Sequence, residues 1–259
     1  GGEIQTLLNA LGMEALDLVA ADPCSPFSDA PGMTFGEGAA FLVLETATHA
    51  RQRAATIFGE LVSYGVSADA YHDIANDPAG NGLRRAMRKA LASAGLEPGD
   101  IAWIRASGTG HREQDAAESL AINEAFGGGP LPPVTSTEPY FGHGNGVSPV
   151  LGMVAALACQ NVGHVPIIPN VQTTRPGCDL PLLGFGGNAG AKPGDFLLNA
   201  VAFGGNNATL VAGRYRSARR LPPLADADIA ITGIGVMSPL GHGRQPFVEG
   251  LRAGRCGIA

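Results

Sequence analysis

Apolar residues recur every three or four positions in several segments of the chain, which is typical of helices packed on one face. Leu83, Met87 and Leu91 step by four residues with basic residues between them, and Gly95 stands where a glycine commonly ends a helix. The same spacing predicts helices over residues 4–19, 82–95, 113–126 and 147–162.

Short apolar runs bounded by helix breakers lie between these segments. They cover residues 39–45, 57–66, 101–106 and 134–137, and we predict a strand for each. The first two are typical of strands that are covered on both faces. Residues 196–213 contain two further strand-like runs separated by Gly204, Gly205, Asn206 and Asn207, which predicts a hairpin. The alternation of strands and helices predicts an α/β fold.

The pattern changes after residue 213. Residues 214–227 are polar and contain prolines, so we expect a linker there, followed by a new apolar strand at 229–234. The predicted organisation is a domain over 1–213, a linker over 214–227 and a second segment over 228–259. The chain begins at Gly1 without Met, inside ordered-looking sequence, so we expect a fragment or a processed product.

Composition and charge exclude several classes of partner. With 259 residues, 45% apolar residues and a mean hydropathy of +0.11, the chain can build a packed core. A net charge of −6 argues against nucleic acid, whose binding depends on Lys and Arg that neutralise phosphates. The linker contains a cluster of arginines that we expect to be solvated: Arg214, Arg216, Arg219 and Arg220. These arginines could still bind an acidic carrier protein locally.

The four cysteines show neither a CxxC pair nor metal-ligand spacing, so neither zinc nor a disulfide framework is predicted. This pattern fits the reducing cytoplasm. No apolar run approaches the roughly 18 residues that a membrane span needs, and no secretory signal precedes the first helix. Gly233 and Gly235 do not begin a dinucleotide-binding motif, because its third glycine would fall on Ser238.

Six motifs occur in an order that resembles the β-ketoacyl synthase family of fatty-acid and polyketide assembly. They are DPCSPFSDAPGMTFGEGAAFLVLE (22–45), SYGVSADAYH (63–72), ASGTGHREQD (106–115), TSTEPYFGHGNG (135–146), VPIIPN (165–170) and AFGGNN (202–207). The resemblance implies a thiolase-like layered α/β fold, a duplicated unit of which this chain supplies the C-terminal half.

Residues 229–258 are similar instead to the first strand and helix of the family, so the order is inverted. One explanation is a junction between two condensing domains, and the other is a permuted or split domain. The long polar linker favours the junction. In both cases the region that carries the family's nucleophilic Cys is absent.

The resemblance also implies the roles of four positions. His143 matches a catalytic His that donates a hydrogen bond to the thioester carbonyl, but Ser107 replaces the other catalytic His. Glu138 falls on the family's active-site Lys, and Gly152 falls on the Glu that pairs with this Lys. Because both partners have changed together, we interpret the site as remodelled rather than damaged.

Five further residues are candidates for the site: Phe203 as a catalytic gate, and Thr109, His111, Gly204 and Gly205 for binding the substrate. Thr109 and His111 match threonines that touch the pantetheine arm of a carrier protein, and Phe203 matches a gating Phe whose loop is freed by Gly204 and Gly205. The alternatives are a turn hydroxyl for Thr109, a loop-lining or surface His for His111 and a core Phe for Phe203.

Two hypotheses follow. In the first, the chain is a degenerate, chain-length-factor-like subunit that shapes the acyl pocket of a ketosynthase. In the second, it is half of an active ketosynthase whose Cys comes from another chain or an upstream segment. Both imply an acyl carrier protein and a ketosynthase companion in a homo- or heterodimer, with no cofactor beyond the phosphopantetheine arm.

Overall fold

A five-stranded mixed sheet forms the centre of the folded part of the chain, with strand order β3-β7-β6-β4-β5. The computed structural model describes residues 1–20, 22–29, 32–186, 190–216, 237–238, 241–242, 245–246 and 249. The sheet strands are β3 (Glu60–Ala68), β4 (Trp103–Arg105), β5 (Val134–Thr135), β6 (Phe196–Val201) and β7 (Asn206–Gly213). Strands β3, β7 and β6 are antiparallel, whereas β4 runs parallel to both β6 and β5.

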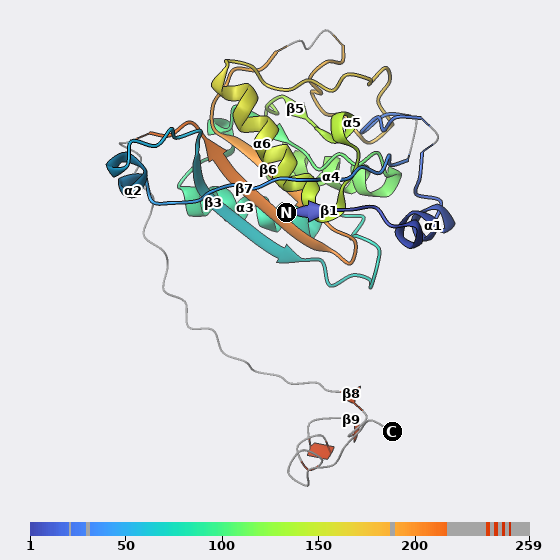
Figure 1. Cartoon of the computed structure of the whole chain (residues 1–259). Coiled ribbons are helices and arrows are strands. Elements are labelled where there is room, and N and C mark those ends of the chain that lie inside the picture. The colour runs from blue at the N-terminus through green and yellow to red at the C-terminus, as the bar shows by residue number, and fades with distance from the viewer. Residues whose placement is uncertain are drawn as a thin grey trace. The chain divides into compact units, whose positions relative to one another are not determined.

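Helices cover both faces of this sheet, as Figure 1 shows. Helices α3 (Asn81–Ala94) and α4 (Arg112–Ala125) pack on one face, and α6 (Ser148–Asn161) packs on the other. The strands alternate accordingly: Ile104 and Leu197 belong to the core under α3 and α4, while Trp103 and Phe196 stack beneath α6 with ring centroids 4.3 Å apart. The predicted α/β fold is confirmed.

The predicted helices and the hairpin agree with the structure to within a few residues. Gly95 ends α3 in a left-handed conformation with φ of 65°, which a glycine adopts without strain. The predicted helix over 4–19 is the shorter α1 (Leu7–Ala15), and none of its residues is buried. Small elements complete this part: β1 (Gly2–Glu3), β2 (Gly38–Ala39), α2 (Ala47–Gln52), α5 (Glu138–Phe141) and 3-10 turns at Pro98–Asp100 and Asn145–Val147.

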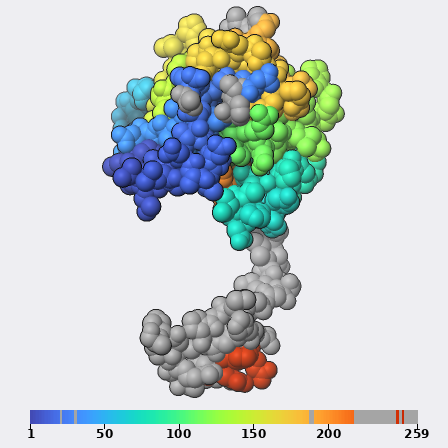
Figure 2. Space-filling model, turned by 90° about the vertical axis from the view of Figure 1, so that its right-hand side faces the viewer, coloured from blue at the N-terminus to red at the C-terminus, as the bar shows by residue number. Residues whose placement is uncertain are grey.

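Two strand predictions need correction. Of the expected buried strand over 39–45, only Ala39 belongs to a strand, β2 (Gly38–Ala39), and Phe41 and Val43 are each 84% exposed. The apolar pattern could not show that, among the described strands, only β1 pairs with this run, and only at Ala39. Strand β3 is not covered on both faces either, because it lies at the sheet edge and leaves Tyr64 and Val66 exposed. Figure 2 shows the blue N-terminal segments at the molecular surface.

The chain separates into two units, Gly1–Pro222 and Pro223–Ala259. In the second unit, β8 (Met237–Ser238) pairs antiparallel with β9 (Gly241–His242). The predicted strand at 229–234 lies outside the described residues, and the predicted domain boundaries remain predictions. Within the described part of the chain, no helix has the length and apolar character to cross a membrane.

Candidate active site

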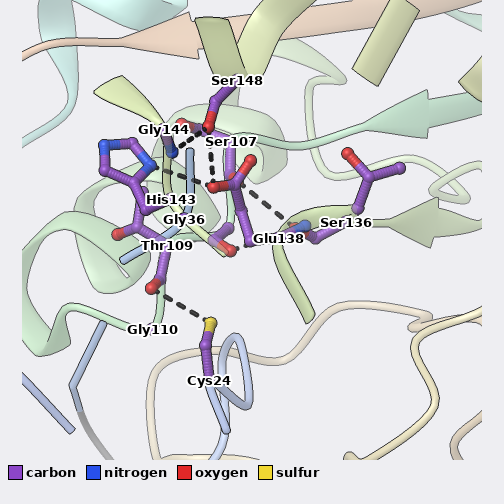
Figure 3. A network of polar contacts seen from close by, with 12 residues as sticks. Cys24, Gly36, Ser107, Thr109, Gly110, Ser136, Glu138, His143, Gly144 and Ser148 are labelled. Atoms are coloured by element: carbon purple, nitrogen blue, oxygen red, sulfur yellow. Dashed lines mark hydrogen bonds and ion pairs between the residues drawn. The ribbon is translucent and has the colours of Figure 1, made fainter. Parts of the chain in front are cut away.

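The loops that carry the predicted site follow the ends of neighbouring strands. Strands β4 and β5 run parallel, so the loop Ser107–Gly110 and the turn Ser136–Glu138 leave the same edge of the sheet. Ser136 joins them, because its Oγ donates to the carbonyls of Ser107 and Gly108 at 3.3 and 3.0 Å. Figure 3 shows these residues in one polar network with His143.

A buried ion pair lies at the centre of this network. Nη2 of Arg105 is 2.6 Å from Oε1 of Glu138, and the two side chains are only 1% and 3% exposed. Thr137 Oγ1 and the carbonyl of Asn199 accept further hydrogen bonds from the guanidinium. Glu138, which stands where the resemblance places a lysine, is therefore neutralised by an arginine from the adjacent strand.

Gly152 on α6 leaves the space that Arg105 occupies. A Cβ atom at Gly152 would lie 2.6 Å from Nε of Arg105 and 2.8 Å from its Cζ. Positions 138 and 152 thus both contribute to the surroundings of Arg105. Their joint remodelling remains a prediction.

His143 is held on one side by several partners. Its Nδ1 is 2.9 Å from Oε2 of Glu138, and Ser148 Oγ donates to the same oxygen at 3.1 Å. Its backbone N–H donates to Thr34, and its carbonyl accepts from Gly36. Gly36 cannot carry a side chain, because a Cβ there would lie 1.8 Å from the carbonyl oxygen of Phe141.

A cavity of about 570 Å³ opens beside this network. His143 and Phe203 both line it, together with Gln114, Asn145 and Asn206. Gly204 and Gly205 have φ of 81° and 78°, so the loop after Phe203 uses the backbone freedom that the sequence suggested. The two side chains predicted to lie at the reacting end of an acyl pocket therefore face a common space.

His111 lies against Phe203. The two ring centroids are 6.3 Å apart in an edge-to-face arrangement, and His111 is partly buried. Burial lowers the pKa of His111, although the charge of Glu113 opposes this shift. His111 is thus neither a surface residue nor a lining residue of the cavity, but a neighbour of the predicted gate.

Ser107 and Thr109 are buried behind the cavity rather than on its lining. The backbone N–H groups of Ser107 and Gly108 donate to the carboxylate of Glu118, each at 2.9 Å. Thr109 is fully buried, and its Oγ1 donates to Gln114 while accepting from the N–H of His111. A role for these residues toward a substrate remains a prediction.

Two buried carboxylates on α4 hold the loops in place. Asp115 accepts from the N–H groups of Phe27 and Gly110, and burial raises its pKa to about 7 against the effect of these hydrogen bonds. Burial likewise raises the pKa of Glu118, although two backbone N–H donors oppose the shift. These carboxylates tie the segment around Phe27, which has φ of 62°, to the loop after β4.

None of the cysteines in the described residues resembles an activated nucleophile. Cys24 is buried and its thiol lies 3.1 Å from the carbonyl oxygen of Thr109. Burial, as the largest cause, raises the pKa of Cys24, and it raises the pKa of Cys178 to about 11. Cys159 lies on α6 and is partly exposed, while Cys256 lies outside the described residues. Because the thiolate is the reactive form, Cys24 and Cys178 are poor nucleophiles.

Sequence reasoning missed Arg105, Asp115 and Glu118. Arg105 did carry a signal, since a charged residue inside an otherwise apolar strand must find a buried partner. The two carboxylates lie in the first turns of a predicted helix, where acidic residues are common. Their positions in the sequence therefore did not indicate that they are buried. Among the described residues, no group of three His, Cys, Asp or Glu side chains is placed to hold a metal ion.

Comparison with known proteins identifies one family to which this chain is similar. Residues 58–172 match the family described as "Beta-ketoacyl synthase, C-terminal domain". The chain is 39% identical over 199 residues to nodulation protein E of Rhizobium sp. (strain N33), which covers 76% of the chain and 49% of that protein. It is 36% identical over 201 residues to 3-oxoacyl-acyl-carrier-protein synthase 2 of Mycobacterium bovis, which covers 75% of the chain and 46% of that protein.

A solved structure agrees with these sequence matches. The structure called the ishigamide ketosynthase/chain length factor superposes with a TM-score of 0.77 at 32% identity, over 83% of this chain and 53% of that one. The predicted thiolase-like α/β fold is therefore confirmed. The chain spans about half the length of the relatives that it matches.

Proposed function

Because this chain belongs, through residues 58–172, to the β-ketoacyl synthase family, we propose that it works in a condensing assembly of fatty-acid or polyketide biosynthesis. Its role there is that of a degenerate, chain-length-factor-like subunit that shapes the acyl pocket. The proposal concerns the assembly as a whole, since the chain alone corresponds to about half of its relatives.

The ion pair of Arg105 and Glu138 carries this proposal. In the resemblance, a lysine at 138 would place a cation beside the reacting thioester, whereas here the position holds a carboxylate that is already neutralised. His111, a candidate to replace the missing imidazole at Ser107, packs on Phe203 and does not line the cavity. A site of this kind can still enclose an acyl chain, but it has lost two of the family's catalytic groups.

The proposed partners follow from the same role. The acyl chain would arrive on the phosphopantetheine arm of an acyl carrier protein, with no further cofactor, and the pocket would be completed by a ketosynthase in a homo- or heterodimer. We expect this assembly in the cytoplasm. Support for a carrier protein comes from the relative whose name is 3-oxoacyl-acyl-carrier-protein synthase 2.

One observation favours the second candidate function. His143 and Phe203 face the same cavity of about 570 Å³, as they would in a working pocket. If another chain or an upstream segment supplies a Cys to this cavity, the assembly could itself condense acyl and malonyl thioesters. We rank this candidate second, because it leaves Glu138 and Ser107 without a role.

Reconstitution distinguishes the two candidates. The chain is combined with its ketosynthase partner, radiolabelled acyl carrier protein and malonyl carrier protein, and the product lengths are compared with and without the chain. The proposed role requires that omitting the chain changes the product length. It also requires that covalent labelling of the assembly does not depend on His143. Label that disappears in His143→Ala would instead establish the catalytic half, and an unchanged product length with no His143-dependent label would exclude both.

A further inference from the structure

The imidazole of His143 is fixed on one side and open on the other. Glu138 holds Nδ1, and the ring of Phe35 meets the imidazole edge-on with centroids 6.3 Å apart. Within the described residues, no group forms a hydrogen bond with Nε2, while His143 lines the cavity. Figure 3 shows the second ring nitrogen on the side away from Glu138.

The partners of Glu138 fix the tautomer of this imidazole. Arg105 is permanently protonated and donates to Oε1, and Ser148 donates to Oε2 because its own Oγ accepts from the N–H of Gly144. An ionised carboxylate can only accept hydrogen bonds, so Nδ1 of His143 must be the donor. In the neutral ring, Nε2 then has a free lone pair toward the cavity.

This arrangement has the geometry of a general base held by a carboxylate. In hydrolases that use such a pair, the carboxylate fixes the ring tautomer and stabilises the imidazolium that forms when the other nitrogen takes a proton. It is the reverse of the role that the resemblance gives to His143, since an unprotonated Nε2 cannot donate to a thioester carbonyl. Arg105 and Ser148 keep the carboxylate in place.

We infer that Glu138 and His143 form a carboxylate–histidine pair that activates water against an acyl thioester in the cavity, which gives this chain a thioester-hydrolysing activity. Nε2 removes a proton from water while the water oxygen bonds to the carbonyl carbon. The carbon–sulfur bond then breaks, and the leaving thiolate takes that proton from His143. The products are a carboxylic acid and a free thiol.

The inference rests on the proposed function only for the class of substrate, an acyl thioester. His143 is the catalytic residue, because its Nε2 meets the reacting water, and Glu138 is a positioning residue that acts through it.

Hydrolysis by the purified full chain tests the inference. The probes are butyryl- and octanoyl-pantetheine, and release of the free acid is followed by chromatography. We expect release above the buffer rate, and a loss on the order of 10²- to 10⁴-fold in His143→Ala, as for removal of a general base. His164→Ala is the matched control, because His164 is exposed and does not line the cavity.

A spectroscopic measurement keeps the test independent of variants that fail to fold. Nitrogen-15 NMR of the ring in the wild-type chain reports which nitrogen carries the proton, and we expect Nδ1 in the neutral form. Glu138→Gln should both slow hydrolysis and change this signal, whereas Glu138→Asp should retain the Nδ1 signal. A proton on Nε2, or hydrolysis that is absent or insensitive to His143→Ala, overturns the inference.

The two proposals fail separately. If the chain changes product length in the reconstituted assembly but does not hydrolyse thioesters, only the general base is wrong. If it hydrolyses thioesters but leaves product length unchanged, only the proposed subunit role is wrong.

Discussion

At the scale of single residues, the ion pair of Arg105 and Glu138 dominates the energetics of the site, because both side chains are almost fully buried. Removing one partner leaves the other charge buried and unpaired, so Arg105→Met is expected to lower the free energy of unfolding by about 3–5 kcal/mol. The double variant Arg105→Met/Glu138→Gln should recover most of this loss. Urea denaturation followed by circular dichroism measures all three proteins.

The control for this prediction is an exposed pair. Glu45 and Arg53 form an ion pair at the surface, and pairs of this type contribute little to stability. Arg53→Met should therefore leave the denaturation midpoint nearly unchanged. If the double variant were as unstable as Arg105→Met, the coupling between the two buried charges would be disproved.

Gly152 gives a prediction whose sign depends on its neighbour. In an ordinary helix interior, alanine is more favourable than glycine by about 1 kcal/mol. Here a Cβ would meet the buried guanidinium of Arg105 at 2.6 Å, and overpacking of this kind costs about 1–3 kcal/mol. Gly152→Ala should thus destabilise the wild-type chain but stabilise an Arg105→Ala background, as thermal denaturation of the four proteins will show.

Residue identity predicted part of this site and missed part of it. The motifs located His143, Glu138 and Phe203, because each lies in a short segment whose sequence is distinctive. They could not show that Glu138 meets Arg105, since that contact depends on the parallel pairing of β4 and β5. Nor could they show that Thr109 and Ser107 lie behind the cavity, which follows from their hydrogen bonds to Gln114 and Glu118.

At the scale of elements, the first turns of α4 place an ionisable group in the core. Asp115 is fully buried, and its pKa is raised from 3.8 to about 7. Between these values the folded chain keeps the proton that the unfolded chain has lost, so stability falls as pH rises. The slope for one such group is about 1.4 kcal/mol per pH unit.

We expect Asp115→Asn to remove this contribution. The variant loses a hydrogen-bond acceptor for one of two backbone N–H groups, so it should be less stable than wild type near pH 4.5. Its deficit should shrink by about 3 kcal/mol between pH 4.5 and 6.5, because only the wild type is penalised as the carboxyl ionises. Urea titrations across this range measure the deficit, and a constant deficit would contradict the raised pKa.

The sequence predicted those elements whose own residues carry a regular apolar spacing or a glycine at the end or turn. Helix α3 has a regular apolar spacing and an end at Gly95, and the hairpin of β6 and β7 has a glycine turn, so both are predictable locally. The run at 39–45 has the composition of a buried strand, but a strand is defined by its neighbours. The exposure of this run depends on which segments pack beside it, and the local sequence pattern does not contain that information.

At the scale of the whole molecule, exposed apolar residues gather in the N-terminal region. Phe41, Val43 and Leu44 are between 71% and 84% exposed, and Leu7 and Leu8 of α1 are 76% and 83% exposed. Large apolar side chains that are exposed close together in sequence are candidates for an interface. It agrees with a fold unit that spans about half of its relatives and with the proposed companion ketosynthase.

This surface should make the isolated chain associate with itself when its companion is missing. Residues 41–45 have no regular structure, and within the described residues their backbone groups form no hydrogen bonds with other backbone groups, so they are also available for pairing, as at an unprotected sheet edge. The double variant Phe41→Lys/Val43→Lys places two charges in this run, and it should shift the sedimentation profile toward the monomer and reduce binding of an apolar dye. Val162→Lys, at a position that is 72% exposed but lies beyond the end of α6, is the control and should change neither property. A wild-type chain that sediments as a monomer without binding the dye would show that this surface is not an interface, and the argument for a companion would then depend on the cavity alone.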